Sequence, residues 1–308
     1  VKERPGYFRN FYAKRALRIW PLYYLLLLVS FTMGPWLIHL AHLPASEVAL
    51  LESKNKWIYI LVIQNLFYYG LNAPTFLAMT WSLAIEEQFY IVYPWLVLVC
   101  SRKNLTRVLL GVLIASPLVR YWAMTHGVGA EAMYFKTLYR LDALSMGGLI
   151  AIWYRSERFS LAQAKWAALS AMAIGVPTGM WLLNHEYWPL LYTMYALGCG
   201  GAVTFALWCF HTNSIFGAPL RFGPLRYVGK VSYCFYLIHQ PMYYILGAYL
   251  RRHPIGYGWG TALLSLFFGF FVCLAIASVS WYLFESQIMK LRGRLEFRQP
   301  EQAVAAAD

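Results

Sequence analysis

Long apolar runs, separated by short polar or basic stretches, are the dominant pattern of this chain. A helix that spans a membrane uses about 20 mostly apolar residues. Eight runs fit such helices, at residues 19–40, 82–100, 105–124, 139–154, 166–183, 190–210, 228–250 and 260–284. The pattern predicts an all-α protein, a polytopic integral membrane helix bundle with about eight spanning helices.

A ninth apolar stretch, residues 57–69, is too short to span a membrane, and Asn72 and Pro74 interrupt the sequence after it. The positions of lysine and arginine decide its interpretation, because cytoplasmic loops are rich in these residues. If the stretch does not cross, 19 of the 26 cations lie on one side, within residues 2–18, 102–107, 155–165, 221–230 and 290–298. We therefore expect a short re-entrant or interfacial segment here and both termini in the cytoplasm, although Arg251 and Arg252 depart from the rule.

The composition agrees with a bilayer as the solvent of this chain. Of its 308 residues, 60% are hydrophobic and 13% are charged, against roughly 45–50% and about 25% in soluble domains. This balance excludes a soluble enzyme and a disordered chain. A net charge of +13 would raise the question of nucleic acid in a soluble protein, but these cations lie in short clusters between apolar runs. We expect membrane lipid and no nucleic acid as partner, one membrane domain over residues 1–290, and a polar cytoplasmic tail over residues 291–308.

The spacing of cysteine and histidine residues gives no sign of a metal site. The five cysteines all lie within apolar runs and form no pair with the spacing of metal ligands. His39 and His42 have helix-like spacing, but they lack a nearby cysteine or acid cluster. We expect no metal cofactor.

Glu86 and Glu87 lie just inside the second predicted span. Ionisable groups in a span are costly and generally face the interior of the bundle or a water-filled cavity. Ser82 and Glu86 are four residues apart and share a helix face, whereas Glu87 points about 100° away. Glu86 is therefore a candidate functional acid. The alternative is that one of the two glutamates stabilises the positive N-terminal end of the helix at the interface.

Ser232, Tyr236 and His239 form a polar stripe, at spacings of four and three, along an otherwise apolar predicted helix. A polar stripe within a span is unsuited to face lipid. Two interpretations are open. The stripe forms hydrogen bonds between helices, or the imidazole of His239 transfers a proton or polarises a hydroxyl group.

Two further charged groups lie at the ends of predicted spans. Arg140 and Asp142 open the fourth span, either as a local salt bridge or as a functional pair. Glu285 closes the last span, where an acid opposes the negative C-terminal end of the helix dipole. Glu285 is therefore expected to have a cationic partner, with an N-terminal arginine as the candidate.

Arg15 and Arg18 are three residues apart on one face of the first predicted helix, at its cytoplasmic end. Membrane topology alone requires cations at this place. The alternative is a cradle for an anion, because guanidinium groups bind phosphate with two parallel hydrogen bonds. A phosphate-bearing substrate such as coenzyme A would approach from this side.

With these segments in place, the chain resembles acyltransferase family 3, the membrane O-acyltransferases that acetylate O-antigen, peptidoglycan and other bacterial polysaccharides. Four blocks carry the resemblance in order along nearly the whole chain. They are Phe-Tyr-x-x-Arg-x-x-Arg-Ile-x-Pro from Phe11 to Pro21, Trp-Ser-Leu-x-x-Glu-x-x-Phe-Tyr from Trp81 to Tyr90, Arg-x-Asp-Ala-Leu with Gly-Gly from Arg140 to Gly148, and Gly-Lys-x-Ser-Tyr-x-x-Tyr-Leu-x-His from Gly229 to His239. Glu285 matches the acid of the family's last helix.

The resemblance implies transfer of an acyl group, expected to be acetyl, from cytoplasmic acyl-CoA to a hydroxyl of a cell-surface or lipid-linked glycan at the bacterial inner membrane. It implies that Arg15 and Arg18 bind acyl-CoA and that Glu86 and His239 are catalytic. The residues that it implies for substrate binding are Trp81, Ser82, Tyr90, Arg140, Asp142, Tyr233, Tyr236 and Glu285.

One departure from the family pattern affects the expected activity. Members of the family begin with a helix that carries an Arg and a His, followed by a second helix that ends in a Ser-Gly-Phe-like motif, and residues 1–308 contain neither. We expect a sequence truncated at its N-terminus, and the alternative is an inactive paralogue. A different class of function, a proton-coupled transporter or flippase, would also use intramembrane acids and a histidine, but it gives no reason for the Arg15 and Arg18 pair. A non-catalytic scaffold for glycan synthesis is the third hypothesis.

Overall fold

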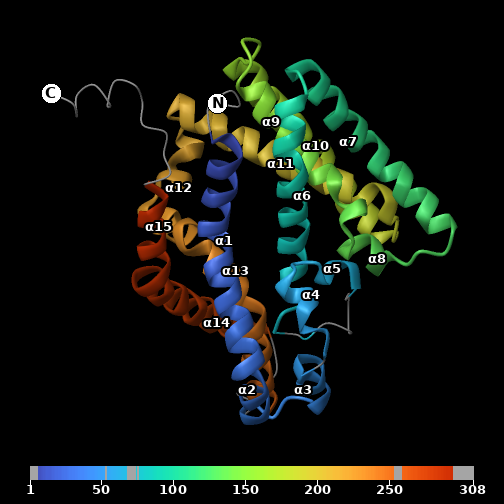
Figure 1. The fold of residues 1–308 in the computed structure, drawn as a ribbon. Coiled ribbons are helices and arrows are strands. Elements are labelled where there is room, and N and C mark those ends of the chain that lie inside the picture. Colours follow the sequence, from blue (N-terminus) through green and yellow to red (C-terminus); the bar gives the residue numbers. More distant parts are fainter. Residues whose placement is uncertain (1–5, 53, 68–73, 75, 253–258, 294–308) are drawn as a thin grey trace. The chain divides into compact units, whose positions relative to one another are not determined.

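The computed structural model describes residues 6–52, 54–67, 74, 76–252 and 259–293 (Figure 1). All regular elements in these ranges are helices, which confirms the predicted all-α class. Asn72 and most of the expected tail, from residue 294 onward, lie outside the described residues. The chain divides into two compact units, one of residues 1–60, 74–79 and 230–308, the other of residues 61–73 and 80–229.

The unit of residues 61–73 and 80–229 is a helical bundle in which α7, α9, α10 and α11 pack against one another (Figure 1). Its elements are α5 (Gln64–Phe67), α6 (Thr80–Val99), α7 (Arg102–Thr125), α8 (Ala130–Phe135), the 3₁₀ turn η3 (Thr137–Tyr139), α9 (Leu141–Tyr154), α10 (Leu161–Asn184), α11 (Trp188–Thr212), η4 (Ile215–Gly217) and α12 (Ala218–Arg221). Side-chain caps start two of these helices, because Ser101 and Ser160 accept hydrogen bonds from the amides of Asn104 and Gln163.

The other unit is built on the first helix and the last helices of the chain. Its elements are α1 (Tyr7–Thr32), α2 (Gly34–Leu40), α3 (Ala45–Glu52), η1 (Lys54–Lys56), α4 (Trp57–Ile60), most of α13 (Gly223–Arg252), α14 (Trp259–Ser280), a π-helical turn (η5, Trp281–Glu285) and α15 (Ser286–Gly293). Helix α1 packs against α15 and the π-helical turn.

Helices occupy all eight predicted spans, but fewer of them are long and apolar enough to cross a membrane. Among the described residues, α7, α10, α11 and the continuous segment Ala262–Leu291 meet both conditions. Helices α1 and α2 together form a fifth, which bends by 58° where Gly34 and Pro35 begin α2. The bend follows from the sequence, because proline lacks the N–H of a helical hydrogen bond and its ring clashes with the preceding turn.

The remaining predicted spans correspond to α6, α9 and α13. Helix α9 has 14 residues, fewer than the about 20 that a spanning helix uses. The short ninth stretch contains the four-residue helices α4 and α5, neither of which is long enough to cross, and its last residues, 68 and 69, lie outside the described residues.

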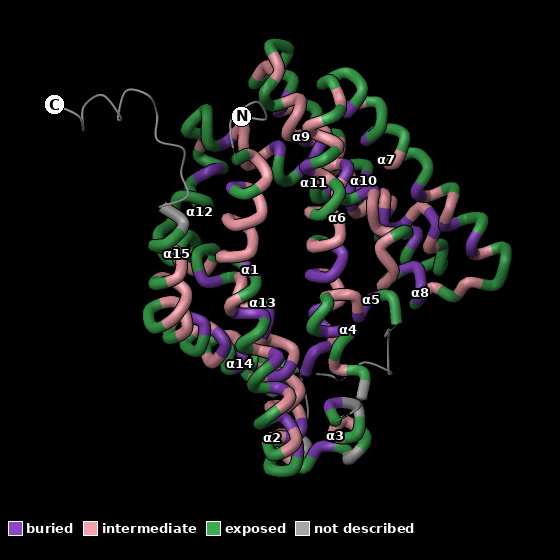
Figure 2. Tube along the Cα trace, in the orientation of Figure 1, coloured by how far each residue is buried: buried purple, intermediate pink, exposed green. Residues whose placement is uncertain are grey.

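The faces of the long helices agree with a lipid environment. In an apolar stretch of 18 residues, only 22% is buried in α7 and only 17% in Ala262–Leu291. In Figure 2, exposed residues recur along α7 between buried and half-buried ones. The exposed side chains include Leu118, Trp166 and Leu264, which are 63%, 65% and 67% exposed. So much exposed apolar surface would be unfavourable in water and is expected in a bilayer.

Glycine residues allow the backbones of α10 and α11 to touch. A Cβ atom on Gly175 of α10 would lie 2.5 Å from the amide nitrogen of Gly198 on α11. A Cβ atom on Gly201 would lie 2.8 Å from the carbonyl oxygen of Ala168. Small residues at such crossings are typical of membrane helices, which associate through close packing.

Candidate functional site

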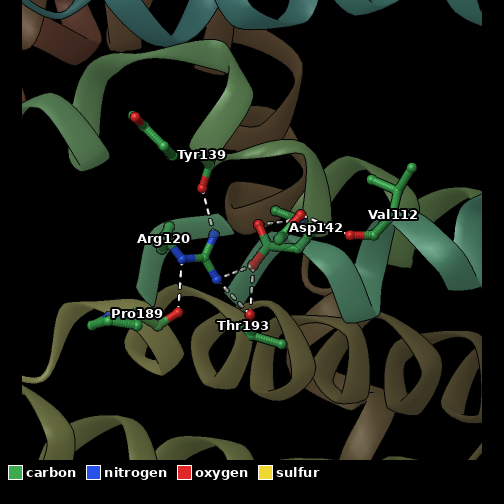
Figure 3. A network of polar contacts seen from close by, with 8 residues as sticks. Val112, Arg120, Tyr139, Asp142, Pro189 and Thr193 are labelled. Carbon is green, nitrogen blue, oxygen red and sulfur yellow. Dashed lines mark hydrogen bonds and ion pairs between the residues drawn. The ribbon is translucent and has the colours of Figure 1, made fainter. Parts of the chain in front are cut away.

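The expected site residues fall into both units, and the most strongly connected group surrounds Arg120 of α7. The Arg120 side chain is completely buried. Its guanidinium donates to the carbonyl of Pro189 at 2.7 Å, to the hydroxyl of Thr193 at 2.6 Å, and to the carbonyl of Tyr139. It also forms an ion pair with Asp142 at 2.8 Å (Figure 3). One side chain therefore connects α7 to the beginnings of α9 and α11.

The local salt bridge between Arg140 and Asp142, one of our two interpretations, is wrong. Asp142 Oδ2 accepts from Arg120 at 2.8 Å and from the Thr193 hydroxyl at 2.7 Å, and Oδ1 accepts from the amide of Ala143 at 3.0 Å. Arg120 takes the carboxylate because it enters from the side of a neighbouring helix, whereas residues two apart on a helix point in different directions.

Arg140 instead lies among aromatic rings. Its guanidinium carbon is 4.3 Å from the ring centre of Tyr192 on α11, 5.3 Å from that of Tyr134 on α8, and 5.7 Å from that of Trp81 on α6. Such contacts favour a cation, more so where water is excluded. Two expected substrate-binding residues, Trp81 and Arg140, are thus brought together, and we call them with Tyr134 and Tyr192 the Arg140 cluster.

A buried amide network connects α6 to the segment before Arg140. Asn65, Gln88 and Thr137 form a closed triangle: the Gln88 amide donates to Asn65 at 2.9 Å, the Asn65 amide donates to Thr137 at 2.8 Å, and the Thr137 hydroxyl donates to Gln88. Asn65 is completely buried. None of these three residues was among the predicted site residues, although polar side chains within apolar segments are unfavourable in a membrane and indicate a functional site.

The acids of α6 lie nearby in sequence but differ in exposure. Glu86 is exposed and accepts a hydrogen bond from Tyr90 at 3.4 Å. The Glu87 side chain is half-buried. Ser82, Glu86 and Tyr90 follow the predicted four-residue spacing along one face of α6.

In the other unit, two tyrosines of α13 hold distant segments. The Tyr233 hydroxyl donates to the carbonyl of Ile19 on α1 at 2.9 Å. The Tyr236 hydroxyl donates to the carbonyl of Met79 at 3.0 Å. For Tyr236 of the polar stripe, the partner Met79 lies in the turn before α6, so the predicted hydrogen bonding between helices stays a prediction.

The half-buried imidazole of His239 has a defined proton position when it is neutral. Its Nδ1 atom lies within hydrogen-bond distance of the carbonyl oxygen of Tyr236. A carbonyl oxygen only accepts, so Nδ1 carries the proton and Nε2 retains its lone pair. Pro241 lies two residues further on in the same helix and lacks the N–H that would bind the carbonyl of Leu237.

Glu285 closes the π-helical turn Trp281–Glu285 in the last helix. The Ser280 hydroxyl donates to Glu285 Oε1 at 3.1 Å. The charge of Arg18 on α1 acts on this carboxylate, but the described residues form no ion pair with it, so the predicted cationic partner stays a prediction, with Arg18 as its candidate. Single π-helical turns inside α-helices occur often at functional sites.

Arg15 lies on the same helix as Arg18 and is half-buried. Its guanidinium carbon is 5.8 Å from the ring centre of Phe11, one turn earlier. Both arginines are inside α1, which starts at Tyr7, so the helix fixes their spacing. In the described part of the chain, no three His, Cys, Asp or Glu side chains are grouped as they would be to hold a metal ion.

Comparison with known proteins now adds to this geometry. A family model for an acyltransferase domain, acyltransferase 3, matches residues 2–283. The chain belongs to the acyltransferase 3 family. All four sequence blocks and the acid that match this family lie within or next to helices α1, α6, α9 and α13 and the π-helical turn.

Relatives of this acyltransferase 3 chain include proteins named for the acetylation of peptidoglycan. It is 28% identical over 260 residues to "Putative peptidoglycan O-acetyltransferase YrhL" of Bacillus subtilis, covering 76% of this chain and 39% of that protein. It is 26% identical over 261 residues to "O-acetyltransferase OatA" of Staphylococcus aureus, covering 80% and 42%. It is 27% identical over 251 residues to "Peptidoglycan O-acetyltransferase OatA" of Listeria monocytogenes, covering 76% and 40%.

The chain thus spans about two fifths of the length of the curated relatives that it matches. No solved structure shows a significant match to this chain.

Proposed function

We propose that this chain is the membrane part of an O-acetyltransferase, which moves an acetyl group from cytoplasmic acetyl-CoA to a hydroxyl of a cell-wall glycan. The observation that carries the proposal is the acyltransferase 3 family match over residues 2–283. The names of the relatives support peptidoglycan as the glycan that accepts the acetyl group. The apolar, largely exposed long helices support a place in the bacterial cytoplasmic membrane.

The donor is proposed to bind at the cytoplasmic end of α1. Arg15 and Arg18 are adjacent on one helix face, and their guanidinium groups match the phosphates of coenzyme A. The positive-inside rule assigns this end, and both termini, to the cytoplasm. The charge of Arg18 also acts on the carboxylate of Glu285, so we propose that donor binding is coupled to the last helix.

The acceptor hydroxyl must lose a proton during attack on the thioester, and we propose His239 as the group that takes it. The neutral imidazole of His239 has its Nε2 lone pair available, because Nδ1 is engaged by the carbonyl of Tyr236. Glu86, which Tyr90 contacts, is the acid proposed to orient a base. The residues proposed to bind substrate are Trp81, Ser82, Tyr90, Arg140 and Asp142 in one unit and Tyr233, Tyr236 and Glu285 in the other.

Acetyl transfer tests the proposal directly. Membranes that contain the full-length protein are incubated with labelled acetyl-CoA and an oligosaccharide acceptor. We expect transfer that Glu86→Gln and His239→Ala reduce by about 100-fold or more, as loss of a general acid or base does. His126→Ala, in an exposed loop, is the matched control and should retain activity. Wild-type activity in the His239→Ala and Glu86→Gln variants would refute their catalytic assignment.

The donor site has its own test within the same assay. Arg15→Ala and Arg18→Ala should raise the KM for acetyl-CoA while the amount of protein in the membrane stays constant. Arg9→Ala is the control, because Arg9 lies on the opposite face of α1 from Arg18. Equal loss of membrane protein in all three variants would leave only a topological role for these cations.

The alternative functions predict different outcomes. A proton-coupled transporter or flippase would show proton-dependent uptake without acetyl transfer, and Glu86→Gln would abolish that uptake. An inactive paralogue or a scaffold would show neither. Transfer of label to the glycan supports the acetyltransferase alone.

A further inference from the structure

Two buried hydrogen-bond donors in the Arg140 cluster have no partner within the described part of the chain. They are Nη1 of Arg140 and the hydroxyl of Tyr192. The Tyr192 side chain is 6% exposed, and its ring centre is 4.3 Å from the Arg140 guanidinium carbon. Buried donors are almost always satisfied, because a donor that is removed from water and left without an acceptor destabilises the folded protein. Two of them in one cluster are a sign of a missing acceptor.

The charges of this region point to an anionic acceptor. Arg120 and Arg140 are cations, whereas Asp142 is the carboxylate that faces both of them. Both oxygens of Asp142 are used, by Arg120, by Thr193 and by the amide of Ala143. Arg140 therefore retains a positive charge without an ion pair. Such a charge away from water favours a negatively charged ligand.

Arg120 also holds both donors in place. It binds the carbonyl of Tyr139, directly before Arg140, and it binds Pro189 and Thr193, which flank Tyr192 on α11. Trp81 and Tyr134 complete the rings around the Arg140 guanidinium. Fixed donors near aromatic rings that exclude water are the arrangement that stabilises charge as it forms in a reaction.

We infer that Arg140 and Tyr192 donate hydrogen bonds to the negatively charged carbonyl oxygen that forms on the acetyl group during transfer. The inference rests on the proposed acetyltransferase function. The acceptor hydroxyl oxygen bonds to the thioester carbon, its proton passes to the base, and the electron pair of the C=O bond moves to oxygen. The pair then returns, the C–S bond breaks, and the thiolate leaves and takes up a proton. The site binds the oxygen while it carries the charge.

Tyr192→Phe separates this role from a structural one. The hydroxyl of Tyr192 has no partner in the described structure, so its loss should leave the protein as stable or slightly more stable. We expect kcat for acetyl transfer to fall by about 100-fold or more, as for the loss of one oxyanion donor, with little change in KM. Tyr195→Phe, the same change on the next turn of α11, is the matched control and should keep wild-type kcat.

Anion binding tests the site without relying on turnover. Acetate carries the same methyl group and a charged oxygen, whereas acetamide is its neutral counterpart. In detergent, acetate should raise the Tm of the purified wild-type protein and of Tyr195→Phe, because a ligand of the folded state stabilises it. Acetamide should not. The gain should be lost in Tyr192→Phe and in Arg140→Lys, which keeps the charge but loses the planar guanidinium.

The two measurements distinguish the possible failures. A wild-type kcat in Tyr192→Phe, or an effect confined to KM, overturns the inferred role in transfer. Equal stabilisation by acetate and acetamide, or stabilisation by acetate that survives in Tyr192→Phe, also overturns it. A wild-type protein that binds acetate in this manner but transfers no acetyl group supports the anion site and contradicts the proposed function.

Discussion

At the scale of single residues, Arg120 is the side chain on which the bundle depends most. Its guanidinium binds three carbonyl or hydroxyl oxygens and one carboxylate inside a spanning helix. Arg120→Met leaves Asp142 buried without its counter-charge, which costs about 3–5 kcal/mol. We expect a large fall in Tm, measured by thermal unfolding in detergent. Arg120→Lys should recover little, because a single ammonium group lacks the fork geometry of guanidinium.

The control for this prediction is Arg107→Met, an exposed cation on the same helix. The double variant Arg120→Met with Asp142→Leu removes both charges and should be more stable than Arg120→Met alone. A Tm for Arg120→Met equal to that of Arg107→Met would show that the ion pair contributes nothing to stability.

The second prediction at this scale concerns Arg18 and Glu285. Ser280 and Arg18 both stabilise the carboxylate of Glu285. A double-mutant cycle with Arg18→Ala and Glu285→Ala should show an interaction energy, because the effects of two charges that attract each other are not additive. We expect about 0.5–1 kcal/mol, at the low end because Arg18 is exposed. The same cycle with Arg9 in place of Arg18 should be additive, and additivity in both cycles would contradict the pairing.

The sequence indicates which charged residues are unfavourable in a span more reliably than it indicates the residues with which they pair. Glu285 opposes the helix dipole, and this alone indicated a cation from the N-terminal segment. Asp142 was assigned to Arg140 because they are close in sequence, while its partner Arg120 is 22 positions away and reaches it only through packing of α7 on α9. Arg120 itself lies in a predicted span, and the cost of a charge there was a signal that the sequence did contain.

At the scale of elements, the contact of α10 and α11 gives a clear prediction. A methyl group on Gly175 would meet the Gly198 nitrogen at 2.5 Å and the carbonyl oxygen of Met194 at 2.6 Å, so the helices would have to separate. We expect Gly175→Ala to destabilise the protein by about 1–3 kcal/mol, as overpacking does, measured by unfolding in detergent.

Gly111→Ala is the matched control for this change. Gly111 lies in α7, and a Cβ atom there would meet nothing within 4 Å. The control should be neutral or stabilising, because alanine favours a helix by about 1 kcal/mol over glycine. Equal behaviour of the two variants would mean that the close approach of the helices is not required.

The pattern of apolar runs predicted the positions of the helices but not their irregularities. The eight helical segments appear as apolar runs in the sequence because a helix within lipid carries mostly apolar side chains along its length. The bend at Gly34 and Pro35 interrupts a run that is apolar on both sides. The π-helical turn Trp281–Glu285 adds one residue to a turn, which hydropathy does not detect.

At the scale of the whole molecule, three helices that carry expected site residues are not among the helices that are long and apolar enough to cross a membrane. Helix α6 carries Glu86 and Glu87, α13 carries His239, and α9 is short and starts beside Arg140. The side chains that make a helix functional also lower its hydropathy. Helices that are both long and apolar enough give four or five spans, whereas the apolar runs of the sequence predict eight.

The orientation of α10 provides a direct test of this topology. Its 24 residues extend about 36 Å, enough to cross the about 30 Å hydrocarbon core. The exposed residues Glu157 and His185 lie just before and just after it. After the five native cysteines are replaced, a membrane-impermeant maleimide should label His185→Cys in intact cells and Glu157→Cys only after permeabilisation. The basic residues around Glu157 assign it to the cytoplasm. The reverse pattern of labelling would invert the topology and move the proposed acetyl-CoA site at Arg15 and Arg18 to the outer face.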